Sequence, residues 1–234
     1  MAPADSDSRV LKEGNSMIIT GIGISGNLGR HFCRQAIERG HTVRCVSRNA
    51  ASCDLPEEVE RFSGSAMDSD VLLKALEGAD VVTPVFPPSL ENPWSYPDEI
   101  KNVLDCARKA GVGRVVGLLG SSGAKVNLGC TLVETDYFAE TTRHFYMNIH
   151  DSFDIYRNLK DLEWAIIVPA ARMQGHMEDK GVYRLRTDEY LVTTDENSKQ
   201  YFDVSQISYG DCARAILDEI ETRAHSGHFI TVGY

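Results

Sequence analysis

The 234-residue sequence predicts a single α/β domain built on a doubly wound parallel sheet. Short apolar runs alternate along the chain with segments whose apolar residues recur at helical spacing, which is typical of parallel strands joined by crossover helices. The first apolar run leads directly into a glycine-rich turn. The length lies within the range of one domain, and a composition of 42% hydrophobic and 25% charged residues is that of an ordinary globular protein.

The first three expected elements form one β-α-β unit. Residues 17–20 are a short apolar run that ends in glycines, as a buried parallel strand does. Apolar residues then recur at helical spacing through residues 27–39, and Gly40 stands where a residue in the left-handed conformation often ends a helix. Residues 42–47 predict the second strand of the unit.

The same alternation continues through the middle of the chain. Strands are expected at residues 59–62, 80–86 and 114–119, and helices around residues 71–76 and 99–110. We therefore expect helices on both faces of the sheet. A proline-rich loop over residues 84–97 is long enough to be functional.

The last third of the chain is less regular. A long helix is expected at residues 145–159, followed by an apolar strand at 164–168 that stops at Pro169 because proline cannot continue an inner ladder. Two short apolar runs, 182–185 and 190–192, flank a polar turn at 186–189 and predict a hairpin or two edge strands.

A helix and a strand are expected to close the chain. Ser208 and Asp211 resemble a capping box with Asp in place of Glu, and apolar residues on one helical face follow them. Residues 229–232 predict the final strand. Residues 16–234 then form the folded domain, with substrate loops at 84–97 and 170–205.

Charge and cysteine content argue against several classes of partner. The 24 Lys and Arg against 34 Asp and Glu give a formal charge of −10, which repels nucleic acid and anionic membrane surfaces. The six cysteines include no C-x-x-C pair and no zinc-ligand spacing, so we expect reduced thiols and no metal. Residues 1–15 mix acidic and basic side chains and predict a flexible arm rather than a signal peptide. We therefore expect a cytoplasmic monomer or homodimer whose partner is a small-molecule substrate, with no nucleic acid and no membrane.

A glycine-rich turn follows the first expected strand. Residues 21–29 read GIGISGNLG and contain G-x-G-x-x-G from Gly21 and G-x-x-G-x-x-G from Gly23. Between a buried strand and an amphipathic helix, this pattern is the fingerprint of a Rossmann-like dinucleotide-binding unit. Residues without a β-carbon let the backbone reach a pyrophosphate, whose charge then lies at the helix N-terminus. The alternative is a tight turn that binds no ligand, while the lack of G-K-[ST] excludes an NTPase phosphate loop.

The end of the second strand bears on the choice of cofactor. An NAD enzyme usually places Asp or Glu there to accept hydrogen bonds from the ribose hydroxyls, whereas this chain has Ser47 and Arg48. A guanidinium binds phosphate through a planar fork, so the sequence favours NADP. Arg30 is a second, weaker candidate for a phosphate contact. The alternative is that Arg48 is a solvated loop charge.

Several segments together resemble a known family. Residues 23–30 read GISGNLGR and are similar to the GATGNIGR turn of atypical short-chain dehydrogenase/reductases, specifically the small NmrA-like NAD(P)H-binding group that includes biliverdin reductase B. The resemblance covers nearly the whole chain after the arm. Further blocks in the same order are VSRN at 46–49, LEGADVV at 76–82, AGVGRVV at 110–116 and ISYGDCA at 207–213. The resemblance implies cofactor contacts at Gly23, Ser25, Gly26, Asn27, Leu28, Arg48, Ser65 and Ala66, with Ser65 standing where the family has an Asp beside adenine.

The chain departs from the family at the positions that carry chemistry. In the family a Ser at the end of the fourth strand contacts substrate or nicotinamide, and here we expect Ser121 in that place, with Ser122 as the alternative. Tyr146 and His150 replace the Tyr-x-x-x-Lys pair of typical members, and their spacing puts a phenol and an imidazole on one helical face. The alternative is that both are solvated or packed side chains. A literal Tyr-x-x-x-Lys at 156–160 lies near the end of the same helix, and we interpret it as coincidental.

These observations favour an NADPH-dependent oxidoreductase that reduces a small conjugated or carbonyl substrate lying beyond the carboxyl ends of the strands. Two alternatives stay open: an NADP-sensing regulator without turnover, and an epimerase or dehydratase with tightly bound cofactor. The candidate pocket walls are apolar loop residues, namely Phe86, Pro87, Trp94, Tyr96, Met173 and Met177.

Overall fold

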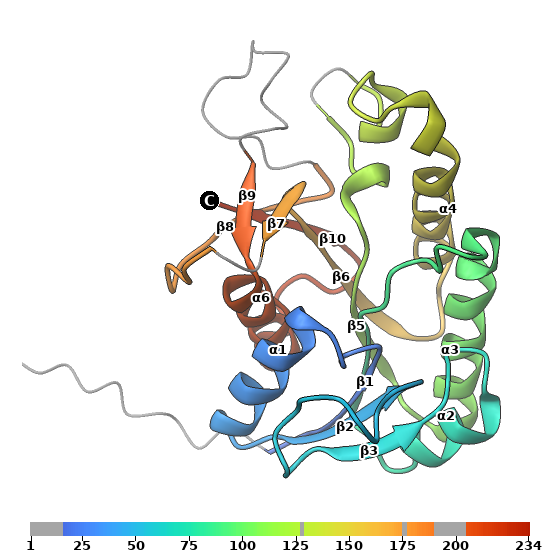
Figure 1. The fold of residues 1–234 in the computed structure, drawn as a ribbon, viewed down its shortest axis with the longest axis vertical. Helices are drawn as coiled ribbons and strands as arrows, with labels where there is room; N and C mark the ends of the chain where they lie inside the picture. The colour runs from blue at the N-terminus through green and yellow to red at the C-terminus, as the bar shows by residue number, and fades with distance from the viewer. Residues whose placement is uncertain (1–15, 127–128, 175–176, 190–204) are drawn as a thin grey trace, which may run out of the picture.

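The computed structural model describes residues 16–126, 129–174, 177–189 and 205–234. The expected arm at 1–15 and the expected short strand at 190–192 lie outside the described residues. An eight-stranded sheet forms the centre of the described part, and helices cover both of its faces (Figure 1). The predicted α/β fold with a doubly wound sheet in a single domain is confirmed, and the sheet is mostly parallel.

The strand order places a change of winding direction beside β1. Across the sheet the order is β3-β2-β1-β4-β5-β6-β10-β8, and each neighbouring pair is parallel except β10 with β8. The chain winds from β1 toward β3 and then returns through β4 toward the other edge, so β1 and β4 flank the switch point at which such sheets bind ligands. The strands are β1 (Ile18–Ile22), β2 (Thr42–Ser47), β3 (Glu60–Ser63), β4 (Val81–Pro84), β5 (Arg114–Leu118), β6 (Glu163–Pro169), β8 (Arg184–Thr187) and β10 (Phe229–Gly233).

Two helical layers enclose the sheet. Helices α1 (Asn27–Glu38) and α6 (Tyr209–Thr222) pack together on one face. Helices α2 (Ser69–Leu76), α3 (Tyr96–Ala110) and α4 (Glu140–Arg157) cover the other face. The connections that the structure describes contain three short 3-10 helices: η1 (Pro93–Ser95), η2 (Ser121–Gly123) and η3 (Leu132–Glu134). Among the described residues, no helix is long and apolar enough to cross a membrane.

The apolar core is divided by the sheet into two clusters. On β1, Ile19 packs with the cluster under α1 and α6, whereas Ile22 packs with the cluster under α2, α3 and α4. The same alternation separates Val81 from Val82 on β4. Burial on both faces explains why these strands read as nearly continuous apolar runs. All six cysteines are free thiols; four are buried, and Cys53 and Cys130 are half-buried.

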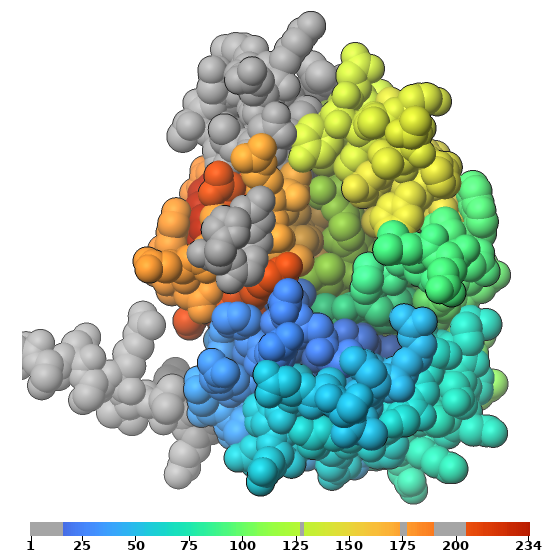
Figure 2. Space-filling model, viewed as in Figure 1, coloured from blue at the N-terminus to red at the C-terminus, as the bar shows by residue number. Residues whose placement is uncertain are grey.

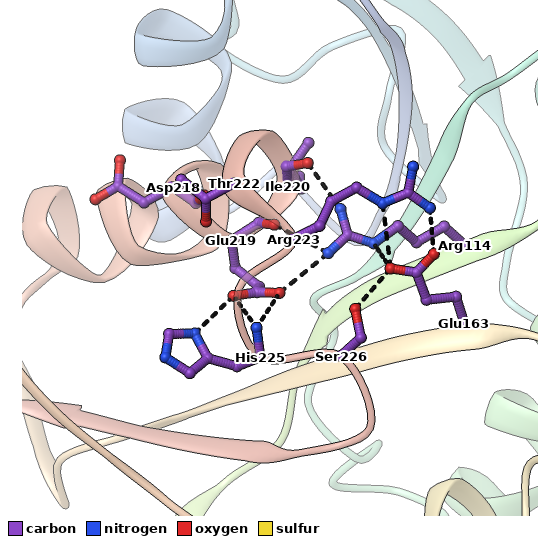
Figure 3. Close-up of polar contacts among 9 residues, drawn as sticks. All are labelled: Arg114, Glu163, Asp218, Glu219, Ile220, Thr222, Arg223, His225 and Ser226. Atoms are coloured by element: carbon purple, nitrogen blue, oxygen red, sulfur yellow. Dashed lines mark hydrogen bonds and ion pairs between the residues drawn. The ribbon is translucent and has the colours of Figure 1, made fainter.

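A polar cluster joins the amino-terminal ends of β5 and β6 to the carboxyl end of α6 (Figure 3). The buried Arg114 guanidinium donates to the Ile220 carbonyl at 2.7 Å and to Glu219 Oε1 at 3.0 Å. Glu163 pairs with Arg114 at 3.0 Å and also accepts hydrogen bonds from Arg223 and Ser226. Because each buried charge has a partner of opposite sign, the cluster holds α6 against the sheet without an unpaired ion.

Three sequence expectations need correction. The strand expected to stop before Pro169 includes this residue, which pairs with Val232 at the end of β6; the ladder continues through the Ala170 N–H, which donates to the Val232 carbonyl at 2.8 Å. Residues 186–187, expected in a turn, belong to the edge strand β8. Helix α4 begins at Glu140, five residues before its expected start.

A second, two-stranded sheet was not expected from the sequence. Strands β7 (Arg172–Gln174) and β9 (Gln206–Ser208) pair in parallel just before α6. Ser208 caps α6, as expected, by accepting a hydrogen bond from the Asp211 N–H at 3.0 Å. The Asp211 carboxylate does not complete the expected capping box, because it accepts instead from the N–H groups of Lys180 and Gly181 at 2.7 and 3.0 Å.

Candidate active site

The carboxyl ends of the central strands meet at one edge of the sheet, and the residues after them line a cavity of about 780 Å³. We call it the larger cavity, because a smaller one adjoins it. Its lining includes residues that follow β1, β4, β5 and β6, together with side chains of α4. Figure 2 shows the surface hollowed here, between the yellow-green α4 region and the orange segment after β6.

A smaller cavity of about 520 Å³ adjoins it and is lined by residues after β2 and β3. Both cavities are lined by Gly23, Gly26, Phe86, Pro87 and Pro88, so they form one elongated cleft across the switch point.

The glycine turn forms the junction of this cleft. Gly23 has φ +82°, and its N–H donates to the Val46 carbonyl at 2.8 Å. A β-carbon at Gly29 would lie 1.8 Å from the Ile24 carbonyl oxygen, so packing within the protein requires glycine there. A β-carbon at Gly26, in contrast, would meet no described protein atom within 4 Å. Open space at Gly26 is what close approach of a ligand to the backbone needs.

The N-terminus of α1 supplies donors at the same place. The first backbone bond of the helix runs from the Arg30 N–H to the Gly26 carbonyl at 3.1 Å. The N–H groups of residues 27–29 precede it and have no acceptor within the helix. With the positive end of the helix dipole, these donors suit a pyrophosphate, so the residues present fit a dinucleotide.

The smaller cavity brings together the expected contacts for the adenosine half of a cofactor. Ser25, Arg48, Ser65 and Ala66 all line it. Arg48 is exposed and makes no hydrogen bond or ion pair with any described residue. Arg30 lies outside the lining of both cavities and pairs with Asp54 at 3.2 Å. Arg48 is therefore the guanidinium that this part of the cleft offers to a phosphate.

Two neighbouring hydroxyls lie at the other end of the cleft. Ser121 and Ser122 in η2 both line the larger cavity, directly after β5. Ser122 is only 1% exposed, and its Oγ has no hydrogen-bond partner among the described residues. A buried hydroxyl without a partner calls for a ligand or water that satisfies it. The structure thus favours Ser122, the alternative of the sequence analysis, at least as strongly as Ser121.

Helix α4 brings Tyr146 to the larger cavity but not His150. The cavity face of α4 includes Thr142, Tyr146 and Ile149. Four residues advance an α-helix about 40° beyond a full turn, so His150 is rotated further away from that face than Tyr146. His150 Nδ1 lies 3.1 Å from Asp151 Oδ1 instead. The expectation that both residues face one pocket is therefore wrong for His150.

Aromatic side chains form part of the lining of the larger cavity. Of the expected wall residues, Phe86, Pro87, Tyr96 and Met173 line it, while Trp94 and Met177 do not. Burial raises the pKa of Tyr96 well above its ordinary value, so this phenol stays protonated. The described lining residues include no Asp, Glu, Lys, Arg or His. Sequence reasoning missed several wall residues because no helical or strand pattern marks them as pocket-facing: Tyr137, Phe138, Phe145 and Tyr209.

Comparisons with known proteins agree with this geometry. A family model described as NAD(P)H-binding matches residues 23–223. A solved structure from Burkholderia pseudomallei, provisionally described as an exported protein, is 30% identical over 93% of this chain and 100% of that chain, with a TM-score of 0.79.

Two more distant structures share the fold. A protein of Streptococcus pneumoniae, provisionally described as an NADH-flavin reductase, is 22% identical over 93% of this chain and 99% of its own, with a TM-score of 0.75. A short-chain dehydrogenase/reductase of Veillonella parvula in complex with NADP is 16% identical over 93% of this chain and 94% of its own, with a TM-score of 0.72.

Proposed function

Because the chain belongs to the NAD(P)H-binding family whose model matches residues 23–223, we propose that it is an NADPH-dependent oxidoreductase that reduces a small conjugated or carbonyl acceptor. The observation that carries the proposal is the open space at Gly26 beside the N–H groups of residues 27–29, which have no acceptor within α1. Gly26 lies where the two cavities meet, so the cleft extends from it on both sides.

The residues of the cleft divide between the two halves of the cofactor. Gly23, Gly26, Asn27 and Leu28 would hold the pyrophosphate, with Ser25 beside it. Arg48 would bind the 2′-phosphate that distinguishes NADP from NAD. The lack of a hydrogen bond or ion pair between its side chain and the described residues supports this role. Ser65 and Ala66 would border the adenosine.

The larger cavity would hold the acceptor. When bound, NADPH supplies a hydride, and reduction of the acceptor also needs one proton. Ser122 and Ser121 would donate hydrogen bonds to the acceptor oxygen, which orients it. Of the expected pair, Tyr146 lines the cavity, and we assign to its hydroxyl the donation of the proton to the acceptor. His150 has no part in this assignment.

A screen of acceptors tests the proposal. The purified chain is mixed with NADPH and, in separate reactions, menadione, riboflavin and cyclohexenone, and the absorbance of NADPH is followed. We expect at least one acceptor to be reduced, and Tyr146→Phe to slow that reaction about 10²-fold or more without loss of cofactor affinity. If the chain binds neither NADPH nor NADH, the proposal is contradicted.

An NADP-sensing regulator without turnover is the second candidate. The absence of His150 from the lining of the larger cavity favours such a regulator, because the site then lacks one member of the expected catalytic pair. Binding of NADPH with no oxidation by any acceptor would select this function. The narrower resemblance to biliverdin reductase B, the cytoplasmic location and the monomeric or dimeric state stay predictions.

A further inference from the structure

Four aromatic residues line the larger cavity, and their rings contact one another in a chain that we name the aromatic wall: Tyr137, Phe138, Phe145 and Tyr146. The Phe138 ring stacks on the Tyr146 ring with centroids 3.9 Å apart and planes at 26°. Tyr137 meets Phe138 edge-on at 4.9 Å, and Phe145 meets Tyr146 edge-on at 5.3 Å. Displacement of one ring therefore disturbs its neighbours.

Half of this wall does not belong to a helix. Phe145 and Tyr146 are fixed by α4, whereas Tyr137 and Phe138 lie in the stretch between η3 and α4. Backbone outside regular structure needs other partners for its carbonyl groups. The position of the Phe138 ring against Tyr146 thus depends on what holds this stretch.

One side chain of α4 supplies these partners. The Arg143 guanidinium donates to the carbonyls of Val133, Thr135 and Phe138, the last two at 3.2 and 3.4 Å. Its Nε also pairs with Glu140 at 3.2 Å. Arg143 itself does not line the cavity. A single guanidinium therefore ties six residues of backbone to the helix that carries the rest of the wall.

We propose that Arg143 is a positioning residue for the acceptor site: by holding residues 133–138 against α4, it sets the aromatic wall on which a planar acceptor stacks. The proposal rests on the proposed function, since it assigns the larger cavity to the acceptor. Arginine suits the task because its planar group carries five N–H donors in a fixed fork, whereas a lysine ammonium is a single point of charge.

A matched pair of variants isolates this role. Arg143→Lys keeps the charge and removes the fork. Arg157→Lys makes the same change in the same helix, where Arg157 pairs with Asp154 at 2.8 Å and, among the described residues, donates to no backbone carbonyl. Riboflavin is the probe, because its planar ring system is fluorescent, and it is titrated in the presence of NADP⁺, which cannot reduce it.

We expect Arg143→Lys to weaken riboflavin binding about tenfold or more, the effect of losing charge-assisted hydrogen bonds. Its NADP⁺ affinity and melting temperature should match the wild type, and Arg157→Lys should match the wild type in all three measurements. In steady-state kinetics with menadione, the rise in KM of Arg143→Lys should exceed any fall in its kcat, because the variant mainly loses binding of the acceptor.

The proposal is overturned if riboflavin affinity is unchanged in Arg143→Lys or falls equally in Arg157→Lys. A loss of riboflavin binding, NADP⁺ binding and melting temperature together would show a purely structural role and also overturn it. A wild type that binds NADP⁺ but no riboflavin would contradict the stacking wall and leave the cofactor assignment intact. Failure of NADP⁺ to bind would contradict the proposed function instead.

Discussion

Gly23 lies directly against Phe86: a β-carbon at Gly23 would stand 2.6 Å from the Phe86 Cβ. Both residues line both cavities, so this contact marks the point at which the cleft passes from its smaller to its larger part. The positive φ of Gly23, +82°, adds a second reason for glycine at this position. The fold itself therefore requires glycine at 23, whereas the described part of the structure gives no packing reason for glycine at 26.

Arg48→Ala should reduce the preference for NADPH over NADH. Loss of one charge-assisted phosphate contact costs about 1.5–3 kcal/mol, so NADPH affinity should fall by tens of fold while NADH affinity hardly changes. Arg30→Ala is the control, because Arg30 pairs with Asp54 and lies outside the lining of the cleft. Both affinities are measured by calorimetric titration. Equal affinities of the wild type for NADPH and NADH would contradict the assignment of Arg48.

Ser122→Ala should separate activity from stability. The Ser122 Oγ is buried and lacks a partner among the described residues, so its removal should leave the melting temperature unchanged or raise it. The same change should lower kcat/KM for the acceptor about tenfold, because a hydrogen bond to the acceptor is lost. Thermal unfolding and steady-state kinetics are measured together with Ser121→Ala. A lower melting temperature with unchanged kinetics would show that the hydroxyl serves only the fold.

The polar cluster of Figure 3 should make stability depend on acid pH. Hydrogen bonding from Arg223, with that from Ser226 and the charge of Arg114, lowers the pKa of Glu163 from its ordinary 4.5 to about 2. A carboxyl whose pKa is lower in the folded state contributes stability above its ordinary pKa, and this contribution is lost as the pH falls toward 2.

Glu163→Gln should therefore have a lower melting temperature at neutral pH and a smaller further decrease between about pH 4.5 and about pH 2. Glu60→Gln, which breaks a half-exposed pair with Arg44, is the control and should leave the pH dependence of the wild type. If the melting temperatures of the wild type and Glu163→Gln decreased with pH in the same way, this account of the cluster would be wrong.

Local patterns explain why most of the fold was predictable. Strand β2 and helix α1 follow from apolar periodicity and a terminal glycine, and Gly40 has the expected positive φ of +85°. The glycine turn could be identified from the sequence because its glycine spacing, between a strand and a helix, is typical of turns whose backbone lies close to a dinucleotide. Strands β7 and β9 were missed, since three residues are too few for a periodic signal.

The acceptor site was less predictable because its walls are set by tertiary packing. Helical spacing places Tyr146 and His150 near one another but does not say which face of α4 meets the cavity, and that face centres on Thr142 and Ile149. Phe138 reaches the wall through the carbonyl contacts of Arg143, which no sequence pattern reports.

The central claim is that the cleft binds NADPH with its pyrophosphate at Gly26, and a calorimetric titration of NADPH into the wild type, Gly26→Ala and Gly23→Ala tests it most directly. A methyl group at position 26 meets open space in the protein, so Gly26→Ala should keep the melting temperature of the wild type and lose NADPH affinity about tenfold or more. Gly23→Ala should lose both stability and affinity, because its β-carbon meets Phe86 at 2.6 Å. Wild-type affinity in Gly26→Ala, or no heat of NADPH binding in the wild type, would contradict the account.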